Sequence, residues 1–379
     1  MALRLRVVVD QLLSPVPGGI GRYAAELTRE IIQTAPESAI VTGVVSKAAE
    51  PALARVRETL PGLADIEVIP LGRRELSLAW QFGALASIPA GTSTHTTSLL
   101  APLARHSDHA GVAVTIHDAV PWTHPETLTR RGARWHRAMA ERARRFADAI
   151  VVPTAAAAAE LADFVDFGDR VRIIGGAPSS SLAVPSDADE RAARLGLPER
   201  YVLAVGTLEP RKGLDALIAA MADPAAPQMP LVIAGPDGWG GVNVASLAAS
   251  AGLAADRVTT LGRVSDEDLA VAYDRATVFA FPSRAEGYGL PVIEAMKLGT
   301  PVVHSDAPAV VEVAGGAGQI VPLSPAESYP ERLATALRAV TDDAVAAAAL
   351  TARGRERAEA FSWRRSAEAV WALHTALAP

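Results

Sequence analysis

A strand, a glycine loop and a helix in immediate succession constrain this chain more than any other stretch does. The apolar run 277–281 predicts a buried strand. Gly287 and Gly289 follow it and permit backbone conformations that other residues resist. Pro291 suits the first position of a helix, where its missing N–H would be unpaired anyway. A helix over 291–298 would turn the N–H groups of its first turn toward the loop, which predicts an anion site.

Two carboxylates flank this predicted anion site. Glu286 lies in the loop, and Glu294 lies eight residues further on, inside the helix. Backbone dipoles can hold a phosphate, while carboxylates accept protons from hydroxyl groups. The combination suits a sugar nucleotide.

The same stretch resembles a known family. Glu286 and Glu294 match the E-x7-E signature of the retaining GT-B glycosyltransferases of family 4, and the surrounding residues 286–296 and 299–303 follow the family pattern. The resemblance implies an α/β protein with two Rossmann-like parallel-sheet domains facing a central cleft. It also implies sugar transfer from a nucleotide diphosphate donor to a hydroxyl acceptor, with retention of configuration and without a metal or other cofactor.

The totals fit such a protein. The chain has 379 residues, half of them apolar, so length and composition predict two domains with their own cores. A net charge of −6 argues against nucleic-acid binding, and the absence of cysteine excludes disulfides and thiolate chemistry. The N-terminal residues 1–10 predict a strand rather than a secretory signal, and no run is long enough to span a membrane. We expect a soluble, cytoplasmic protein.

The predicted domain boundary lies in a segment rich in glycine, proline and serine between residues 175 and 189. We place an N-terminal, acceptor-side domain at 1–178, a nucleotide-sugar-binding domain at 179–362, and a final helix at 363–379. In the GT-B architecture such a helix crosses back to the first domain. Relatives usually carry an Asn-Gly-Val-Asp-like turn at the boundary, which this chain lacks.

The first half offers a glycine-rich run, 17–23, between a strand at 5–10 and a helix from about residue 20 to 34. On the residues alone, a tight structural turn and a ligand-binding loop are equally good interpretations. In the resembling family the loop lies where donor phosphate and acceptor meet, which makes Gly18 and Gly19 candidate site residues.

His117 and Asp118 follow the apolar run 111–116. Polar residues at the carboxyl end of a parallel strand lie where α/β sheets bind ligands, although a histidine there can also simply cap the strand. The resemblance implies that His117 contacts a hydroxyl of the donor sugar and that Asp118 orders the loop.

The second half carries a cationic turn after the predicted strand 201–206. Arg211 can form a bidentate clamp on a diphosphate, and Lys212 can supply a point charge. No cysteine or evident acidic cluster is available to hold a metal, so we expect these cations to neutralise the diphosphate. Thr207 is a further donor-binding candidate. Many relatives carry arginine there, which would leave the charge to Arg211 and Lys212.

The resemblance assigns the remaining donor contacts. It implies that Glu286 accepts hydroxyl protons from the sugar ring and that Glu294 binds the ribose. Base recognition falls to the backbone near Arg263 and Val264. The backbone of the loop would lie against the sugar and the distal phosphate, through Gly287, Tyr288, Gly289 and Leu290.

A basic segment at 130–146 contains seven arginines, with Trp135, Met139 and Phe146 spaced to share one helical face. A core helix with a solvated charged face is the favoured interpretation. Peripheral contact with an anionic membrane is the alternative.

The run 205–212 looks like bacterial mannosyltransferases that use GDP-mannose, so we expect an alpha-mannosyltransferase of polysaccharide or glycoconjugate biosynthesis. UDP-glucose, UDP-N-acetylglucosamine and dTDP-rhamnose are alternative donors. We expect a glycan or a lipid-linked glycan as the acceptor.

No covalent nucleophile stands out, which favours a front-face route in which the departing phosphate takes the acceptor's proton. A sugar-nucleotide epimerase and a non-catalytic sugar-nucleotide-binding protein are competing hypotheses on the same fold. A Rossmann oxidoreductase is disfavoured because the glycine run lacks the full G-x-G-x-x-G spacing.

Overall fold

The computed structural model describes residues 3–14, 18–86, 88–105, 111–238 and 240–378. The chain forms two compact units, the first from Met1–Gly176 with Ser362–Pro379 and the second from Ala177–Phe361. These divisions lie within two residues of the boundaries that we placed at 178 and 362. The expected cleft between the domains stays a prediction.

A parallel sheet forms the centre of the first unit, and its strands follow the order β3-β2-β1-β4-β5-β6-β7. Continuous apolar runs such as those of β1 and β6 are typical of strands covered on both faces. The strands are β1 (Arg4–Val8), β2 (Ile40–Ser46), β3 (Asp65–Ile69), β4 (Thr92–Thr96), β5 (Gly111–Thr115), β6 (Ala149–Val152) and β7 (Val171–Ile173).

Helices connect most of these strands, as is usual for crossover connections in a parallel sheet, but none lies between β4 and β5 among the described residues. They are α1 (Gly18–Gln33), α2 (Glu50–Thr59), α3 (Arg73–Gln81), α4 (Val120–Thr123), α5 (Arg130–Phe146) and α6 (Ala155–Ala162). Short 3-10 turns lie at η1 (Asp10–Leu13), η2 (Pro125–Thr127) and η3 (Gly168–Arg170).

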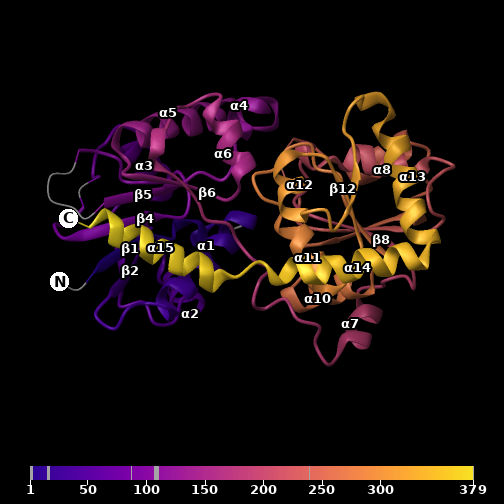
Figure 1. Cartoon of the computed structure of the whole chain (residues 1–379), viewed down its shortest axis with the longest axis horizontal. Helices are drawn as coiled ribbons and strands as arrows, with labels where there is room; N and C mark the ends of the chain where they lie inside the picture. The colour runs from indigo at the N-terminus through magenta and orange to yellow at the C-terminus, as the bar shows by residue number, and fades with distance from the viewer. Residues whose placement is uncertain (1–2, 15–17, 87, 106–110, 239, 379) are drawn as a thin grey trace. The chain divides into compact units, whose positions relative to one another are not determined.

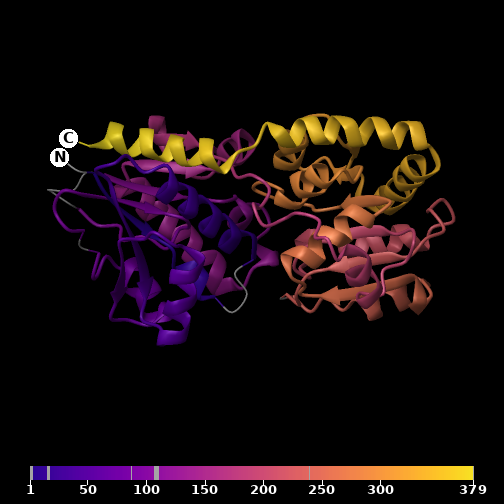
Figure 2. The same cartoon turned by 90° about the horizontal axis from the view of Figure 1, so that it is seen from below.

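The last helix of the chain, α15 (Trp363–Leu377), belongs to the first unit. It packs along α1 (Figures 1 and 2, yellow beside indigo). The indole Nε1 of Trp371 donates a hydrogen bond to the carbonyl oxygen of Ile31 at 3.0 Å, and the Ser366 hydroxyl donates to that of Gly175 at 2.9 Å. The chain thus returns to its first unit after completing the second.

The second unit is built on another parallel sheet, with the order β10-β9-β8-β11-β12-β13. Its strands are β8 (Val202–Val205), β9 (Leu231–Ala234), β10 (Val258–Gly262), β11 (Val278–Phe281), β12 (Val302–Ser305) and β13 (Gln319–Val321). The central strands β8, β9 and β11 contribute buried aliphatic and aromatic side chains to the cores on both faces of the sheet.

The helices of the second unit are α7 (Ala188–Arg194), α8 (Leu214–Ala222), α9 (Val244–Ser250), α10 (Asp266–Arg275), α11 (Leu290–Leu298), α12 (Pro308–Ala314), α13 (Tyr329–Asp342) and α14 (Ala344–Glu359). Three 3-10 turns, η4 (Pro210–Lys212), η5 (Ala255–Arg257) and η6 (Ala326–Ser328), complete it. α8, α9 and α13 contribute to one core, whereas α10, α11 and α12 contribute to the other. The α/β class and the two parallel sheets agree with the sequence prediction.

The glycine-rich run differs from its predicted form. We expected a loop before a helix starting near residue 20, but α1 already begins at Gly18. Gly18 has a φ of +61°, in the left-handed region where glycine is favoured, so it makes the turn into the helix. Pro17, the first residue of the predicted run, lies outside the described residues.

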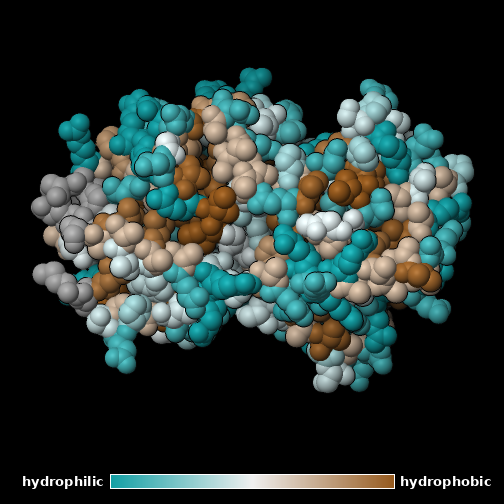
Figure 3. Space-filling view, in the orientation of Figure 1, coloured by the Kyte–Doolittle hydropathy of each residue, from teal (hydrophilic) through white to brown (hydrophobic). Residues whose placement is uncertain are grey.

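Hydrophilic side chains cover much of the face shown in Figure 3, and the apolar ones that show through form separate patches. Among the described residues, no helix combines the length and apolar character needed to cross a bilayer.

Strand β4 is polar in sequence yet fully buried. Its His95 lies 3.3 Å from His374 of α15, measured from Nδ1 to Nε2, with the rings edge to face. Burial lowers the pKa of His95 to about 4, and burial together with the charge of His95 lowers the pKa of His374 well below its usual value. The last helix therefore buries two neutral histidines against the centre of the first sheet.

This pair predicts acid sensitivity. Because the pKa of folded His95 lies below that of an unfolded histidine, its contribution is complete above about pH 6.5 and is lost as the pH falls toward about 4. We expect His95 alone to remove about 2 kcal/mol of the free energy of unfolding between pH 7.5 and pH 5.0. Denaturant titrations at the two pH values measure this.

The loss of unfolding free energy at pH 5.0 should be smaller in the double variant His95→Leu/His374→Leu. It should persist in His124→Gln, because the His124 ring contacts the exposed Thr123 hydroxyl. An unchanged acid loss in the double variant would contradict the assignment.

Candidate active site

The predicted glycine loop is present between β11 and α11. Gly289, with a φ of +113°, is the N-cap of α11, and Gly299, with a φ of +84°, is its C-cap. The helix begins at Leu290, so Pro291 is its second residue rather than its first. The N–H of Leu290, in the first turn of α11, has no carbonyl one turn earlier in the helix to accept it.

The cationic turn η4 lies against the start of this loop. Gly213, with a φ of +67°, ends the turn, and a Cβ added there would clash with the carbonyl oxygen of Pro282. The backbone N–H of Arg284 donates to the carbonyl oxygen of Arg211 at 2.8 Å. Glycine at position 213 therefore allows the two segments to approach closely enough for their side chains to meet.

Glu286 accepts hydrogen bonds from both predicted cations. Its Oε2 lies 2.9 Å from Arg211 Nη1, and its Oε1 lies 2.6 Å from Lys212 Nζ. Arg211 also donates through Nε to Glu209 at 3.0 Å and through Nη1 to the carbonyl oxygen of Ala285 at 3.2 Å. With 9% of its side chain exposed, Glu286 is almost fully buried within this ion cluster of Glu209, Arg211, Lys212 and Glu286.

The cluster controls the charge state of its members. Burial raises the pKa of Glu286, but the charges of Arg211 and Lys212 outweigh burial and lower it to about 2. Burial and the neighbouring Arg211 lower the pKa of Lys212, while the contact with Glu286 opposes that shift. Glu286 is thus a carboxylate at neutral pH and a weak base.

Arg284 holds the loop to the cationic turn, a role that the sequence did not reveal. Its Nη1 donates to the carbonyl oxygen of Pro210 at 2.8 Å, and its guanidinium pairs with both carboxylate oxygens of Asp215 at 2.9 and 2.6 Å. The only sequence signal was an arginine in a loop of mostly small residues. Glu209, the second acid of the ion cluster, also escaped prediction.

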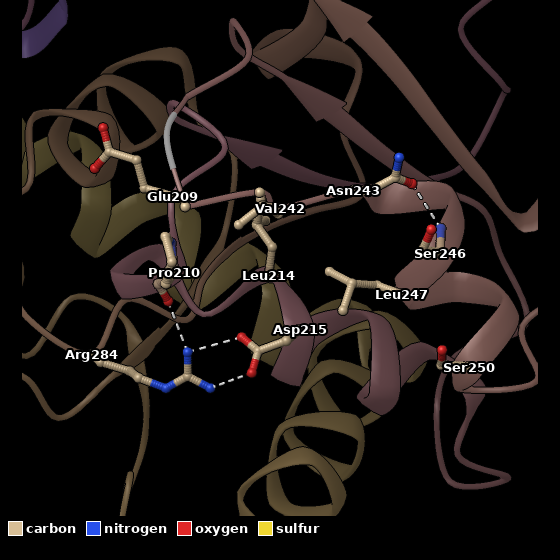
Figure 4. Close-up of a pocket in the computed structure, with 12 residues that line it drawn as sticks. Glu209, Pro210, Leu214, Asp215, Val242, Asn243, Ser246, Leu247, Ser250 and Arg284 are labelled. Atoms are coloured by element: carbon tan, nitrogen blue, oxygen red, sulfur yellow. Dashed lines mark hydrogen bonds and ion pairs between the residues drawn. The ribbon is translucent and has the colours of Figure 1, made fainter. Parts of the chain in front are cut away.

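A pocket of about 380 Å³ adjoins the cationic turn (Figure 4). Its lining comes from η4, the start of α8, the 240–243 loop and α9. Figure 4 shows the Arg284–Asp215 pair on one side and Leu247 of α9 on another. Polar and apolar groups therefore both face this space, next to the ion cluster.

Glu294, the second acid of the signature, is 3% exposed on α11 and accepts a hydrogen bond from the hydroxyl of Tyr273 on α10 at 3.3 Å. Tyr288 packs edge to face against Phe361, with ring centroids 6.3 Å apart. The predicted ribose role of Glu294 and the sugar contacts of Gly287, Tyr288, Gly289 and Leu290 stay predictions.

The other donor candidates lie at the carboxyl edge of the same sheet. Thr207 follows β8, next to the bridge that joins Leu208 to Asp237. Arg263 and Val264 follow the edge strand β10. Their positions suit ligand binding at that edge, and their donor contacts stay predictions.

The first unit presents the remaining candidates separately. His117 Nε2 lies 2.8 Å from the carbonyl oxygen of Thr97, and its ring packs edge to face against Tyr23. Burial lowers its pKa, partly offset by the contact with Thr97 and the charge of Asp118. Asp118 Oδ1 accepts the N–H of Val120 at 3.0 Å, which orders the turn.

Gly18 and Gly19 are exposed at the start of α1. A Cβ added to either one would meet no heavy atom within 4 Å. Packing against the described residues therefore does not require glycine at position 19, and the predicted ligand contacts of Gly18 and Gly19 stay predictions.

The basic helix α5 packs its apolar side into the first unit. Met139 is buried, and Trp135 and Phe146 are partly buried against the core. Arg137 donates to the carbonyl oxygen of Pro121 at 2.8 Å, and Arg144 and Arg145 pair with Glu141. Figure 3 shows hydrophilic side chains over much of this region. Membrane contact through 130–146 stays a prediction.

Within the described ranges, no three or more histidine, cysteine, aspartate or glutamate side chains gather closely enough to hold a metal ion.

Comparison with protein families identifies the chain. Residues 186–357 match the family described as "Glycosyl transferases group 1", and residues 17–176 match "Glycosyltransferase Family 4". The two matches cover most of both units. The chain belongs to the group 1, family 4 glycosyltransferases.

Among curated proteins, the chain is similar to O-antigen chain mannosyltransferase B of Escherichia coli, with 34% identity over 49% of this chain and 50% of that protein. It is also 34% identical to D-inositol 3-phosphate glycosyltransferase of Rhodococcus opacus, over 53% of this chain and 47% of that protein. The chain thus spans about half the length of these relatives.

Solved structures show the GT-B fold. Sucrose-phosphate synthase from Thermosynechococcus elongatus aligns over 99% of both chains with a TM-score of 0.75 and 24% identity. HepE from Anabaena, solved with UDP and glucose, aligns over 99% of this chain and 100% of its own, with a TM-score of 0.74 and 18% identity.

The Arg284 contacts generate a prediction. Arg284→Ala should weaken nucleotide-sugar binding about tenfold, because Glu286 and Arg211 lose the link that fixes their segments. GDP-mannose and UDP-glucose are tested in turn by calorimetry. Stability should fall by at most about 1 kcal/mol, since the Arg284–Asp215 pair is partly exposed.

Arg338→Ala, which breaks an exposed pair with Asp342, is the matched control. Unchanged ligand affinity in Arg284→Ala would show that the link does not position the site.

Proposed function

We propose that the chain transfers a hexose from a nucleotide diphosphate sugar to a hydroxyl group of a glycan or glycolipid acceptor, with retention of configuration. One observation carries the proposal: a buried carboxylate, Glu286, contacts both Arg211 and Lys212 in the loop before a helix N-terminus. A hydrogen-bond acceptor and two cations thus lie together, which supports binding of a sugar hydroxyl group and a diphosphate at this place.

In the proposed reaction, Arg211 and Lys212 hold the diphosphate and stabilise the charge that grows on it as the sugar departs. The bond from the anomeric carbon to the phosphate oxygen breaks while the bond to the acceptor oxygen forms. The acceptor's proton passes to the departing phosphate. Glu286 is an unsuitable base for that proton because its pKa is about 2, and its carboxylate is better suited to accept a hydroxyl group of the sugar.

GDP-mannose is the proposed donor, and mannose is the sugar transferred. The 34% identity to an O-antigen chain mannosyltransferase supports it. The similarity to D-inositol 3-phosphate glycosyltransferase, and a neighbour of the same fold solved with UDP and glucose, keep other nucleotide sugars as the second candidates.

Donor identity is tested by thermal shift in EDTA with GDP-mannose, UDP-glucose, UDP-N-acetylglucosamine and dTDP-rhamnose. A ligand that binds the folded chain raises its apparent stability, by about 2.7 kcal/mol at one hundred times Kd. We expect the largest shift with GDP-mannose. A selective shift with another nucleotide sugar would identify that compound as the donor instead. The absence of a shift with all four would contradict the proposed function.

Removal of the ion cluster should abolish activity without unfolding the chain. We expect Glu286→Ala and Lys212→Ala each to lower the release of nucleoside diphosphate from the donor about 10²–10³-fold, the usual cost of one charge-stabilising contact. Circular dichroism checks folding.

Glu267→Ala and Lys47→Ala, which remove exposed residues of the same types, are the controls. Full turnover in both cluster variants would mean that the site is misplaced. Conversion of the sugar nucleotide without acceptor, into an isomer that keeps the nucleotide, would instead favour the epimerase hypothesis.

A further inference from the structure

We infer that Glu286 selects the nucleotide diphosphate sugar over the nucleoside diphosphate that remains after transfer. The inference rests on the proposed function and assigns a second role to the residue. The site would bind its substrate in preference to its product, although both ligands offer the same nucleoside and the same two phosphates.

The first support is the charge balance of the ion cluster. Arg211 and Lys212 carry two positive charges, and Glu209 and Glu286 carry two negative charges. The cluster is therefore neutral overall. The two carboxylates balance the charge of Arg211 and Lys212, so a further negative charge on the ligand is repelled by the carboxylate nearest to it as well as attracted by the cations.

The second support is where the Glu286 carboxylate lies. Both its oxygens are bonded to the cations, at 2.9 and 2.6 Å, and 91% of its side chain is shielded, since 9% is exposed. A phosphate that accepts hydrogen bonds from Arg211 and Lys212 must share their N–H groups with Glu286. A buried carboxylate that loses donors is costly unless another donor replaces them.

The nucleotide sugar and the nucleoside diphosphate differ both in charge and in the hydrogen bonds that they can offer to Glu286. In a nucleotide sugar, the terminal phosphate oxygen is esterified to the sugar, and the sugar brings hydroxyl groups that can donate to Glu286. In the free nucleoside diphosphate, that oxygen is ionised above its second pKa of about 6, and no hydroxyl group is present there. The product therefore adds one more negative charge beside Glu286 and returns no hydrogen bond.

Calorimetry at pH 8 in EDTA tests this with GDP and GDP-mannose, or with the pair that the donor panel identifies. In Glu286→Gln, which keeps the shape but removes the charge, GDP should bind about tenfold more tightly than in the unaltered protein. GDP-mannose should gain no affinity, because the loss of a strong hydroxyl acceptor offsets the loss of repulsion.

Glu209→Gln is the matched control. It also removes one negative charge beside Arg211, but Glu209 hydrogen-bonds to Arg211 and acts on Lys212 through charge alone, whereas Glu286 hydrogen-bonds to both cations. In Glu209→Gln, the ratio of the dissociation constants of GDP and GDP-mannose should stay within about twofold of the ratio in the unaltered protein. Equal changes in the two variants would overturn the assignment to Glu286, because any nearby carboxylate would then act alike.

A second measurement has a decisive outcome in the unaltered protein. The methyl ester of the terminal phosphate of GDP lacks the extra charge and also lacks a sugar. The unaltered protein should bind this ester several-fold more tightly than GDP, and the advantage should vanish in Glu286→Gln. An ester that binds the unaltered protein no better than GDP overturns the charge argument, whether or not the variant folds.

The two proposals fail in different ways. If no nucleoside diphosphate or nucleotide sugar binds the unaltered protein, the proposed function is wrong, and so is the selection by Glu286. If the ligands bind but Glu286→Gln leaves the ratio of their affinities unchanged, the proposed function stands and the selection is wrong.

Discussion

The candidate site in the second unit depends on one interaction, the contact of a buried carboxylate with two cations. Glu286 could not be buried alone, because removing an ionised carboxylate from water is costly without partners. Arg211 and Lys212 supply those partners, and the resulting cluster is electrically neutral. The same contact keeps Glu286 ionised and fixes the positions of Arg211 and Lys212. Stability of the loop and the proposed chemistry thus rest on the same charges.

The parallel sheet explains how these groups come together. The cationic turn follows β8 and the glutamate loop follows β11, and these two strands are neighbours in the sheet. Loops after neighbouring parallel strands emerge at the same edge. Gly213 then permits a close approach that any side chain would block, and Arg284 fixes the loop to the turn. Backbone geometry, more than the charges themselves, decides which oxygen meets which nitrogen.

The first unit contains a polar strand, β4, at the centre of its sheet. β4 lies between β1 and β5, so its side chains have no access to water. The last helix of the chain covers one part of it and places His374 against His95. Helix α15 therefore contributes to the core of the first unit, and the chain between residues 177 and 361 folds as an insertion between two segments of that unit.

The sequence by itself determined the two α/β units, the strand, loop and helix around Glu286, and the residue types that carry the charge, because apolar runs, glycines and prolines act locally. It also carried the family resemblance that the comparisons confirmed. Only the tertiary structure decided that Glu286 pairs with cations 74 and 75 residues earlier in the chain and that Arg284 joins the two segments. Such pairings depend on strand order and on the space beside single glycines, which no local pattern encodes.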